Sequence, residues 1–441
     1  QVLGEGLRPY EREVDLSRLH GEYPQRQHIV QYRERDLDFV HRLLEEQGIR
    51  YVFEQGENAE RLVLLDDVES HVPLVSLGSE DGFLPMTLAE GEADQREDLL
   101  SFVRESRIKP TVARGASYDW RSPGVEAFES AGDDDDGPEL EDYDFDPPSA
   151  GLGVDEVERA VRLRGKQLRQ DVQLFKGAST ATQLHPGASF ELGDHPQGEL
   201  NGRYLVVKVT HQGDLSQAAG QAYQNRFQAV PLGKGWVPPR NHSKPVIPGV
   251  QTATVTGDDE ICTDESGRIQ VQFHWDRKRS TTCYVPMVQP WAGAGWGTQF
   301  LPRVGMEVVV SFIDGNPDRP VVVGSLYNGA NQPPFPLPGE KTRSGIRSNS
   351  VPGGGGWNEL MFEDTAGAEE IHLRAQRNFN QETLNDHIAH VGQHQHTVVD
   401  GEQHNTVQGP QYETVRGEQV LRVQQDRQVF VMGSCVEEVE K

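Results

Sequence analysis

The sequence has only three cysteines in 441 residues, Cys262, Cys283 and Cys435. Three thiols make neither a disulfide framework nor a metal-binding cysteine motif, so free thiols in a protein made in the cytoplasm are expected. Runs of eighteen apolar residues are also missing, which argues against a membrane-spanning helix. No signal peptide is recognisable, although residue 1 resembles the middle of a domain and suggests a truncated start.

Recognised catalytic motifs are missing as well. The sequence contains no G-x-S-x-G elbow, Walker loop, Rossmann glycine fingerprint or H-E-x-x-H stretch. The acidic pair Glu45/Glu46 is typical of a solvated helix face rather than of a general acid–base couple. We therefore expect no enzymatic activity, no catalytic residue and no cofactor.

Positive charge is scarce, with 42 Lys and Arg against 69 Asp and Glu and a formal net charge of −27. Like charges repel, so nucleic acid and anionic membranes are disfavoured as resting partners. The most acidic stretch, 131–148, includes Asp133 to Asp136. A calcium loop needs spaced ligands and a defined turn, so a solvated loop is the favoured interpretation.

Glycine and proline are plentiful, at 46 and 27 residues, while hydrophobic residues make up 35% of the chain. This composition fits a strand-and-turn protein better than a helical bundle. The length allows two or three domains with full cores. We therefore expect a mainly β protein with a minor α+β part.

The last fifty residues carry the most regular pattern in the chain. Valine recurs at every eighth position: Val391, Val399, Val407, Val415, Val423, Val431 and Val439. Glycine follows two places later at Gly401, Gly409, Gly417 and Gly433, whereas Gln393 and Gln425 break that second rule. Side chains alternate in an extended chain, so an even period keeps the valines on one face. Glycine supplies the backbone freedom of a corner, including φ > 0.

Each octad thus predicts one strand and one turn. Eight residues span only roughly 26 Å, enough for one wall but not for a circuit around a core. A lone wall cannot bury its own valines, and three identical chains would close a triangular prism. The alternative is a disordered polar tail, because Gln, Glu and Arg crowd the other positions. The regular register favours an intertwined trimeric β-helix with the octad valines as its core and the octad glycines at its corners.

A histidine cluster lies near the start of the octads: His387, His390, His394 and His396. An H-x-H pair on each of three strands could present six imidazoles to one metal. Counting by twos from Val391 and Val399, however, places His394 and His396 on the outward face. We expect exposed polar spacers and no metal site.

The first half of the chain predicts a mixed α+β unit, 1–238. Residues 1–33 lack a clear period, whereas Asp36 to Gln47 has apolar residues at helical spacing and Gly48 in the position that ends a helix. Asp155 to Gln170 predicts a second amphipathic helix, and strand patterns separate the two. The breaker-rich stretch 239–248 marks a linker.

Residues 249–330 are the densest block of short strands, which suits a small closed barrel of the OB type. Five strands are expected: Gln251–Thr256, Arg268–Trp275, Cys283–Gln289, Glu307–Ile313 and Pro320–Leu326. Aromatic residues within the block and the basic residues around Arg268 leave nucleic-acid binding as an alternative, although the chain is acidic and barrel core and subunit contact explain the aromatics better. A Pro- and Gly-rich connector, 331–380, with two short strands, leads into the octads, 381–441.

Long stretches of this sequence resemble the valine–glycine repeat (VgrG) family, the spike of the type VI secretion system. The resemblance is carried by residues 23–54, by GRIQVQFHWDRKR (267–279), by residues 288–329 from VQPWAGAGWG to SLYNG, and by the octads. It implies a phage-like tail hub, an OB barrel and a trimeric β-helix. It also implies a homotrimer whose base sits on a hexameric Hcp tube next to baseplate components. The tip would accept a PAAR-repeat protein or an effector.

By the same resemblance, sheath contraction would drive the trimer through a target membrane, so the protein would leave the cell without a signal peptide and meet a membrane only transiently. Several features depart from the family. The hub of the family normally begins well before the position matching Gln1, so we expect the first hub barrel to be absent or removed. No lysozyme-like insertion fits between 330 and 380, and further octads or an effector domain could follow Lys441. A related extracellular contractile or phage tail spike, and a trimeric carbohydrate-active tailspike, remain alternatives.

Overall fold

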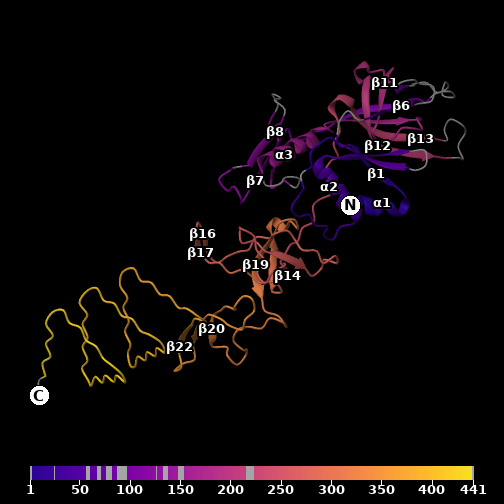
Figure 1. Cartoon of the computed structure of the whole chain (residues 1–441). Coiled ribbons are helices and arrows are strands. Elements are labelled where there is room, and N and C mark those ends of the chain that lie inside the picture. Colours follow the sequence, from indigo (N-terminus) through magenta and orange to yellow (C-terminus); the bar gives the residue numbers. More distant parts are fainter. Residues whose placement is uncertain are drawn as a thin grey trace. The chain divides into compact units, whose positions relative to one another are not determined.

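The computed structural model describes residues 2–23, 25–55, 60–66, 71–75, 82–86, 97–125, 127–132, 138–147, 153–214 and 223–439. The chain forms two compact units, Gln1–Arg374 and Ala375–Lys441. The first contains every helix and strand of the described residues (Figure 1). The fold is mainly β, as predicted, and the helices of the described residues are too short or too polar to cross a membrane.

The first long helix, α2 (Asp36–Gln47), has the predicted bounds. Gly48 ends the helix in the left-handed conformation, with φ at 71°. Its N–H donates hydrogen bonds to carbonyls of the last turn. After it come β2 (Arg50–Gln55) and β3 (Glu60–Leu65), and β1 (Glu13–Arg18) completes a sheet in the order β1-β3-β2.

The prediction that residues 1–33 are irregular is wrong, because they also contain α1 (Val2–Leu7) and the short helix η1 (Arg8–Tyr10) besides β1. None of the three elements has a fully buried residue, so they give little hydrophobic periodicity to read.

A seven-stranded sheet forms the main core of the first half. Its order is β4-β11-β12-β13-β10-β6, with β5 added beside β11. The strands are β4 (Val72–Pro73), β5 (Phe83–Pro85), β6 (Leu99–Ser106), β10 (Gln173–Ser179), β11 (Ala188–Gly193), β12 (Gly202–Gly213) and β13 (Tyr223–Pro231), with η2 (Gly198–Leu200) and η3 (Leu232–Lys234) beside them. An aromatic cluster fills it, in which the rings of Phe102 and Tyr204 lie 4.8 Å apart.

The second predicted helix, α3 (Val154–Arg169), covers a three-stranded sheet. This sheet has the order β8-β7-β9 and comprises β7 (Val112–Ser117), β8 (Ala127–Gly132) and β9 (Glu141–Phe145). Val157 and Val161 pack on Ala113 of β7. Gly115 permits this close approach, because a Cβ there would lie 2.5 Å from Val161 Cγ2. The acidic run Asp133 to Asp136 lies outside the described residues.

The OB block contains a four-stranded sheet in the order β15-β14-β18-β19. Its strands are β14 (Gln251–Thr256), β15 (Gln270–Phe273), β18 (Glu307–Phe312) and β19 (Pro320–Leu326), with η4 (Ile313–Gly315) following β18. A small hairpin, β16 (Ala292–Gly293) and β17 (Trp296–Gly297), extends from it.

One of the five predicted strands, Cys283–Gln289, is not a strand in the structure. Its segment makes only two single bridges, Ile269 with Val285 and Met287 with Val322. The bridges still join the two edge strands of the sheet, β15 and β19, through one extended segment. Pro286 removes a backbone donor between the bridges, which explains why a continuous ladder does not form.

Residues 239–248, predicted to be a linker, pack against both neighbouring regions. The backbone N–H groups of Asn241 and His242 each donate a hydrogen bond to Glu45 Oε2 of α2, at 2.9 Å. At the other end, Lys244 forms an ion pair with Asp318 at 3.0 Å, and Ile247 is buried in the OB core. The segment therefore fastens the OB block to α2 at several points.

The prediction that Glu45 and Glu46 form a solvated face is wrong. Both are buried, and Arg42 beside them is only 1% exposed. Glu46 accepts from Arg26 at 2.8 Å and from Arg42 at 3.3 Å, and Arg42 also reaches Glu34 at 2.7 Å. A buried carboxylate is tolerated when it is paired and hydrogen-bonded, and these partners come mainly from outside the helix.

We predict that Glu46→Ala lowers the free energy of unfolding by about 3–5 kcal/mol, because it removes the counter-charge of Arg26 and leaves the buried Arg42 with Glu34 alone. Glu158→Ala is the matched control, since Glu158 pairs with Arg162 on the exposed side of α3. That change should cost at most about 0.5 kcal/mol. Urea unfolding followed by circular dichroism measures both, and equal effects would contradict this account of the buried network.

Candidate trimerisation surface

We call the second compact unit, Ala375–Lys441, the octad unit. Its described residues 391–439 contain neither a strand nor a backbone–backbone hydrogen bond. It is nevertheless regular, and the yellow part of the trace in Figure 1 shows extended stretches separated by repeated turns. Bends occur every eighth position, at residue pairs 376–377, 384–385, 392–393, 400–401, 408–409, 416–417, 424–425 and 432–433. Each bend directly follows an octad position.

The first two bends were missed by the sequence analysis. They follow Ala375 and Thr383, which occupy the position of valine in the later octads. The repeat thus begins two octads before Val391, and at the first residue of the second compact unit. Without valine and glycine as markers, only the spacing of eight could have revealed these octads.

The octad valines share a partly covered face of the chain. Six of them, Val391 to Val431, are 46–54% exposed, and only the last, Val439, reaches 81%. Apolar residues at even positions are far more exposed, for example Val398 at 86% and Val436 at 84%. These six side chains are therefore partly covered within the single chain, and about half of each remains uncovered there.

The octad glycines do not use the freedom to adopt φ > 0 in the single chain. None of Gly401, Gly409, Gly417 and Gly433 has a left-handed backbone, and Gln393 and Gln425 occupy the same bend as these glycines. A Cβ built on any of the four glycines would meet open space in the single chain. The bend itself thus does not require glycine, and Gln425 does not remove it.

A second uncovered apolar surface lies just before the octads. It is one face of the sheet β20-β21-β22, whose strands are Arg343–Arg347, Glu359–Glu363 and Glu370–Arg374. The register aligns two cross-strand rows on this face: Ile346, Leu360 and Leu373, then Ser344, Phe362 and Ile371. The most exposed of them, Ile371, is 72% exposed. We call the apolar members, Ile346, Leu360, Phe362, Ile371 and Leu373, the neck face.

The opposite face of this sheet is already packed. Met361 is buried, and Arg347 forms an ion pair with the buried Glu359 while its guanidinium stacks near Phe335 and Trp357. Arg374 lies 3.8 Å from the centre of the Trp357 ring, a cation–π contact. The neck face is therefore the side of the sheet that remains for a partner.

At the end of β21, hydroxyl hydrogen bonds from Thr342 and Thr365 lower the pKa of Glu363 to about 2. The Glu363 carboxylate also accepts a hydrogen bond from Arg343 Nε at 3.1 Å. It therefore stays charged at neutral pH and links β20 to β21.

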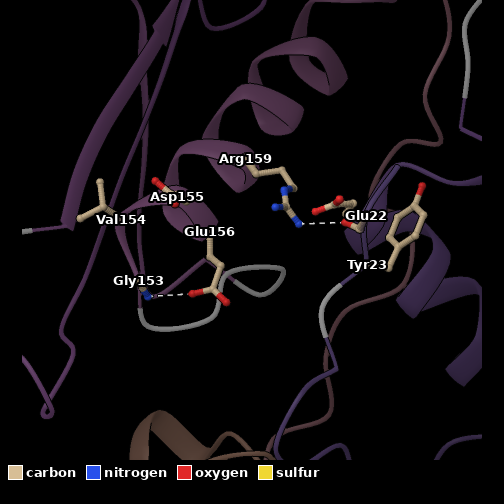
Figure 2. A pocket seen from close by; sticks show the side chains of 7 residues that line it. All are labelled: Glu22, Tyr23, Gly153, Val154, Asp155, Glu156 and Arg159. Atoms are coloured by element: carbon tan, nitrogen blue, oxygen red, sulfur yellow. Dashed lines mark hydrogen bonds between the residues drawn. The ribbon is translucent and has the colours of Figure 1, made fainter. Parts of the chain in front are cut away.

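A cavity of about 560 Å³ lies at the start of α3 and is lined by acidic residues and Arg159; Figure 2 shows its lining side chains. Its polar groups form hydrogen bonds within the chain. The Gly153 N–H donates to Glu156 Oε2 at 2.8 Å, and Arg159 Nη1 donates to the Glu22 carbonyl at 3.2 Å. No group of three or more potential metal ligands occurs among the described residues.

The remaining candidate residues from the sequence are placed as follows. His394 and His396 lie on exposed chain with ring centres 6.3 Å apart. Arg268 forms an ion pair with Asp264 at 2.7 Å, and its guanidinium lies 4.8 Å from the centre of the Trp120 ring. Both contacts are within the chain, so Arg268 has a structural role. All three cysteines are free thiols, as predicted.

Comparison with known families divides the chain into three matches. Residues 1–217 match the phage tail baseplate hub family (GPD). Residues 251–327 match the type VI secretion system/phage-baseplate injector OB domain, and residues 344–441 match the C-terminal trimerisation domain of bacteriophage T4 gp5. The third match includes both the neck face and all seven octad valines.

Curated relatives agree over most of the chain. It is 36% identical over 412 residues to the type VI secretion system spike protein VgrG4b of Pseudomonas aeruginosa, covering 86% of this chain and 49% of the relative. VgrG5 of the same organism is 35% identical over 409 residues, covering 86% and 50%. The actin cross-linking toxin VgrG1 of Vibrio cholerae is 32% identical over 394 residues, covering 86% and 35%.

Among solved structures, the chain is similar to the E. coli c3393 protein, a type VI secretion component, with 21% identity, a TM-score of 0.48 and coverage of 74% of this chain and 70% of that one. The chain spans about half the length of the first two curated relatives. Three matching families in hub, OB and trimerisation order, together with these relatives, show that the chain belongs to the VgrG family of type VI secretion spike proteins.

Proposed function

We propose that three copies of this chain form the spike of a contractile secretion machine, which punctures a target membrane and delivers effectors. The observation that carries the proposal is the shared, half-covered face of six octad valines in a unit without internal strands. Two further chains would supply the missing walls of a prism. Val391, Val399, Val407, Val415, Val423, Val431 and Val439 would then form its core.

The energetics support such an assembly. Burying the exposed half of a valine stabilises by roughly 1 kcal/mol, and the gain recurs in each octad of each chain. Backbone groups that lack partners in the single chain would pair between chains, which leaves no lateral sheet edge. Gly401, Gly409, Gly417 and Gly433 would sit at corners, where the approach of neighbouring chains rather than φ > 0 would favour glycine.

The domain boundaries form part of the same proposal: hub 1–238, linker 239–248, OB barrel 249–330, connector 331–380 and trimeric β-helix 381–441. The bends from residue 376 suggest that the prism begins near Ala375. The neck face would start the core by packing against its two symmetry copies.

The partners proposed for the trimer are a hexameric Hcp tube and baseplate components at its base, and a PAAR-repeat protein or effectors at its tip. The protein would be made in the cytoplasm, assembled in the apparatus and delivered without a signal peptide. Such a role requires stiffness rather than turnover, and we propose no reaction for this chain. A related phage or extracellular contractile spike is the second candidate, because the hub match is to a phage family.

We predict that Val407→Asp with Val415→Asp abolishes the trimer, because each layer would bury three carboxylates without counter-charges. Light scattering should report the mass of one chain, whereas the unaltered chain gives three and keeps that mass in detergent. Val398→Asp with Val436→Asp is the matched control, since both valines are on the exposed face. A trimer that survives the first pair of changes would count against the prism.

Ile371→Asp should weaken the trimer, because it places a carboxylate in the neck face. Ile108→Asp, at an isoleucine that is 91% exposed in the first unit, should leave the trimer unchanged. We expect at least a tenfold increase in the concentration at which trimers dissociate. Because the dissociation constant of a trimer scales with the square of that concentration, this corresponds to about 2.8 kcal/mol per trimer. Sedimentation equilibrium measures it, and identical behaviour of the two variants would show that the neck face is not at the interface.

A further inference from the structure

A crevice of about 610 Å³ in the first unit has an unusual charge for this acidic chain. It lies between the second half of α3, the strands β10, β12 and β13, and residues 236–241. Five cationic side chains and one carboxylate line it: Arg107, Lys109, Arg164, Lys208, Arg240 and Asp171. In a chain of net charge −27, this is a local excess of positive charge.

Most of these cations have acidic neighbours. Arg164 is held by Asp142 at 2.7 Å, and Asp171 accepts from Arg107 at 3.1 Å and Lys109 at 3.3 Å. Lys208 has no ion-pair partner among the described residues. Arg240 has one, Asp144 Oδ2, 3.5 Å from its Nη1, and Glu46 and Asp142 also act on it electrostatically. Of the five cations, Lys208 is thus the one without an ion pair among the described residues.

Arg240 also has an unused hydrogen-bonding edge. Its Nε and Nη2 are buried and have no hydrogen-bond partner among the described residues. These two nitrogens form the side of the guanidinium that binds a carboxylate or phosphate through two parallel hydrogen bonds. Arg240 lines the crevice, so a ligand there would meet this buried edge once the side chain rotates away from Asp144.

Charges of both signs surround Arg240. Burial lowers the pKa of Arg240 and the neighbouring Arg164 lowers it further, while Asp144, Glu46 and Asp142 act in the opposite direction. Gln167, in the same lining, has its amide nitrogen engaged by the carbonyls of Glu45 and Pro238, each at 2.9 Å, but its Oε1 is buried without a donor. The crevice therefore lacks an acceptor for Arg240 and a donor for Gln167.

We propose that this crevice binds an oxyanion of the carboxylate or phosphate class, held by the Nε–Nη2 edge of Arg240 with Lys208 as a second cation. An acidic peptide would supply both the carboxylate and an N–H for Gln167, whereas inorganic phosphate would supply only acceptors. The inference does not depend on trimer formation, because every residue named belongs to one compact unit.

Calorimetric titration of the full chain tests this, with inorganic phosphate and a capped tripeptide of acidic residues as probes, in chloride buffer at constant ionic strength. We expect saturable binding with one site per chain. Tighter binding of the peptide would identify a protein segment as the source of the anion, and tighter binding of phosphate would identify a small molecule.

Arg240→Gln should weaken binding at least tenfold, and Arg240→Lys should weaken it nearly as much, because lysine keeps the charge but lacks the paired donors. Arg203→Gln is the matched control, at an exposed arginine of β12 outside the crevice. The melting temperature of each variant checks that it folds. Absence of saturable binding to the unaltered chain, or an equal loss in Arg203→Gln, would overturn the proposal.

Discussion

An apolar side chain on a single extended strand has nothing in its own chain to pack against. This constraint governs the second compact unit, Ala375–Lys441, where the octads of the described residues repeat without a strand or a core of their own. The chain turns every eight residues and gathers its octad valines on one side, but about half of each of the six from Val391 to Val431 remains exposed. The geometry of the octads is thus present in one chain, while their stabilisation has to come from others.

The first unit follows a different physical rule. Its junction between α2 and the OB block depends on buried charge, with Glu45 accepting from Asn241 and His242 while Glu46 accepts from Arg26 and Arg42. Such contacts are directional and fix one arrangement of the segments. A junction of this kind suits a protein in which force would pass from hub to spike, as the proposed function requires.

The sequence predicted those elements whose signals are local. Helix α2 and strands β14 and β19 have the expected bounds, since helical spacing, alternation and a terminal glycine are all contained in short stretches. The failures have long-range causes. Burial of Glu45 and Glu46 depends on partners near residues 26 and 242, and the extended segment around Pro286 is set by two edge strands. The two octads before Val391 lack the marker residues altogether.

Hydrogen exchange of the backbone amides in residues 391–439 tests the central claim most directly. In the single chain these amides have no backbone partner among the described residues, so any protection has to come from other chains. The account predicts slow exchange along the octads of the purified protein, lost together with the trimer. Exchange at the rate of an unstructured chain would contradict the claim that neighbouring chains complete the octad core.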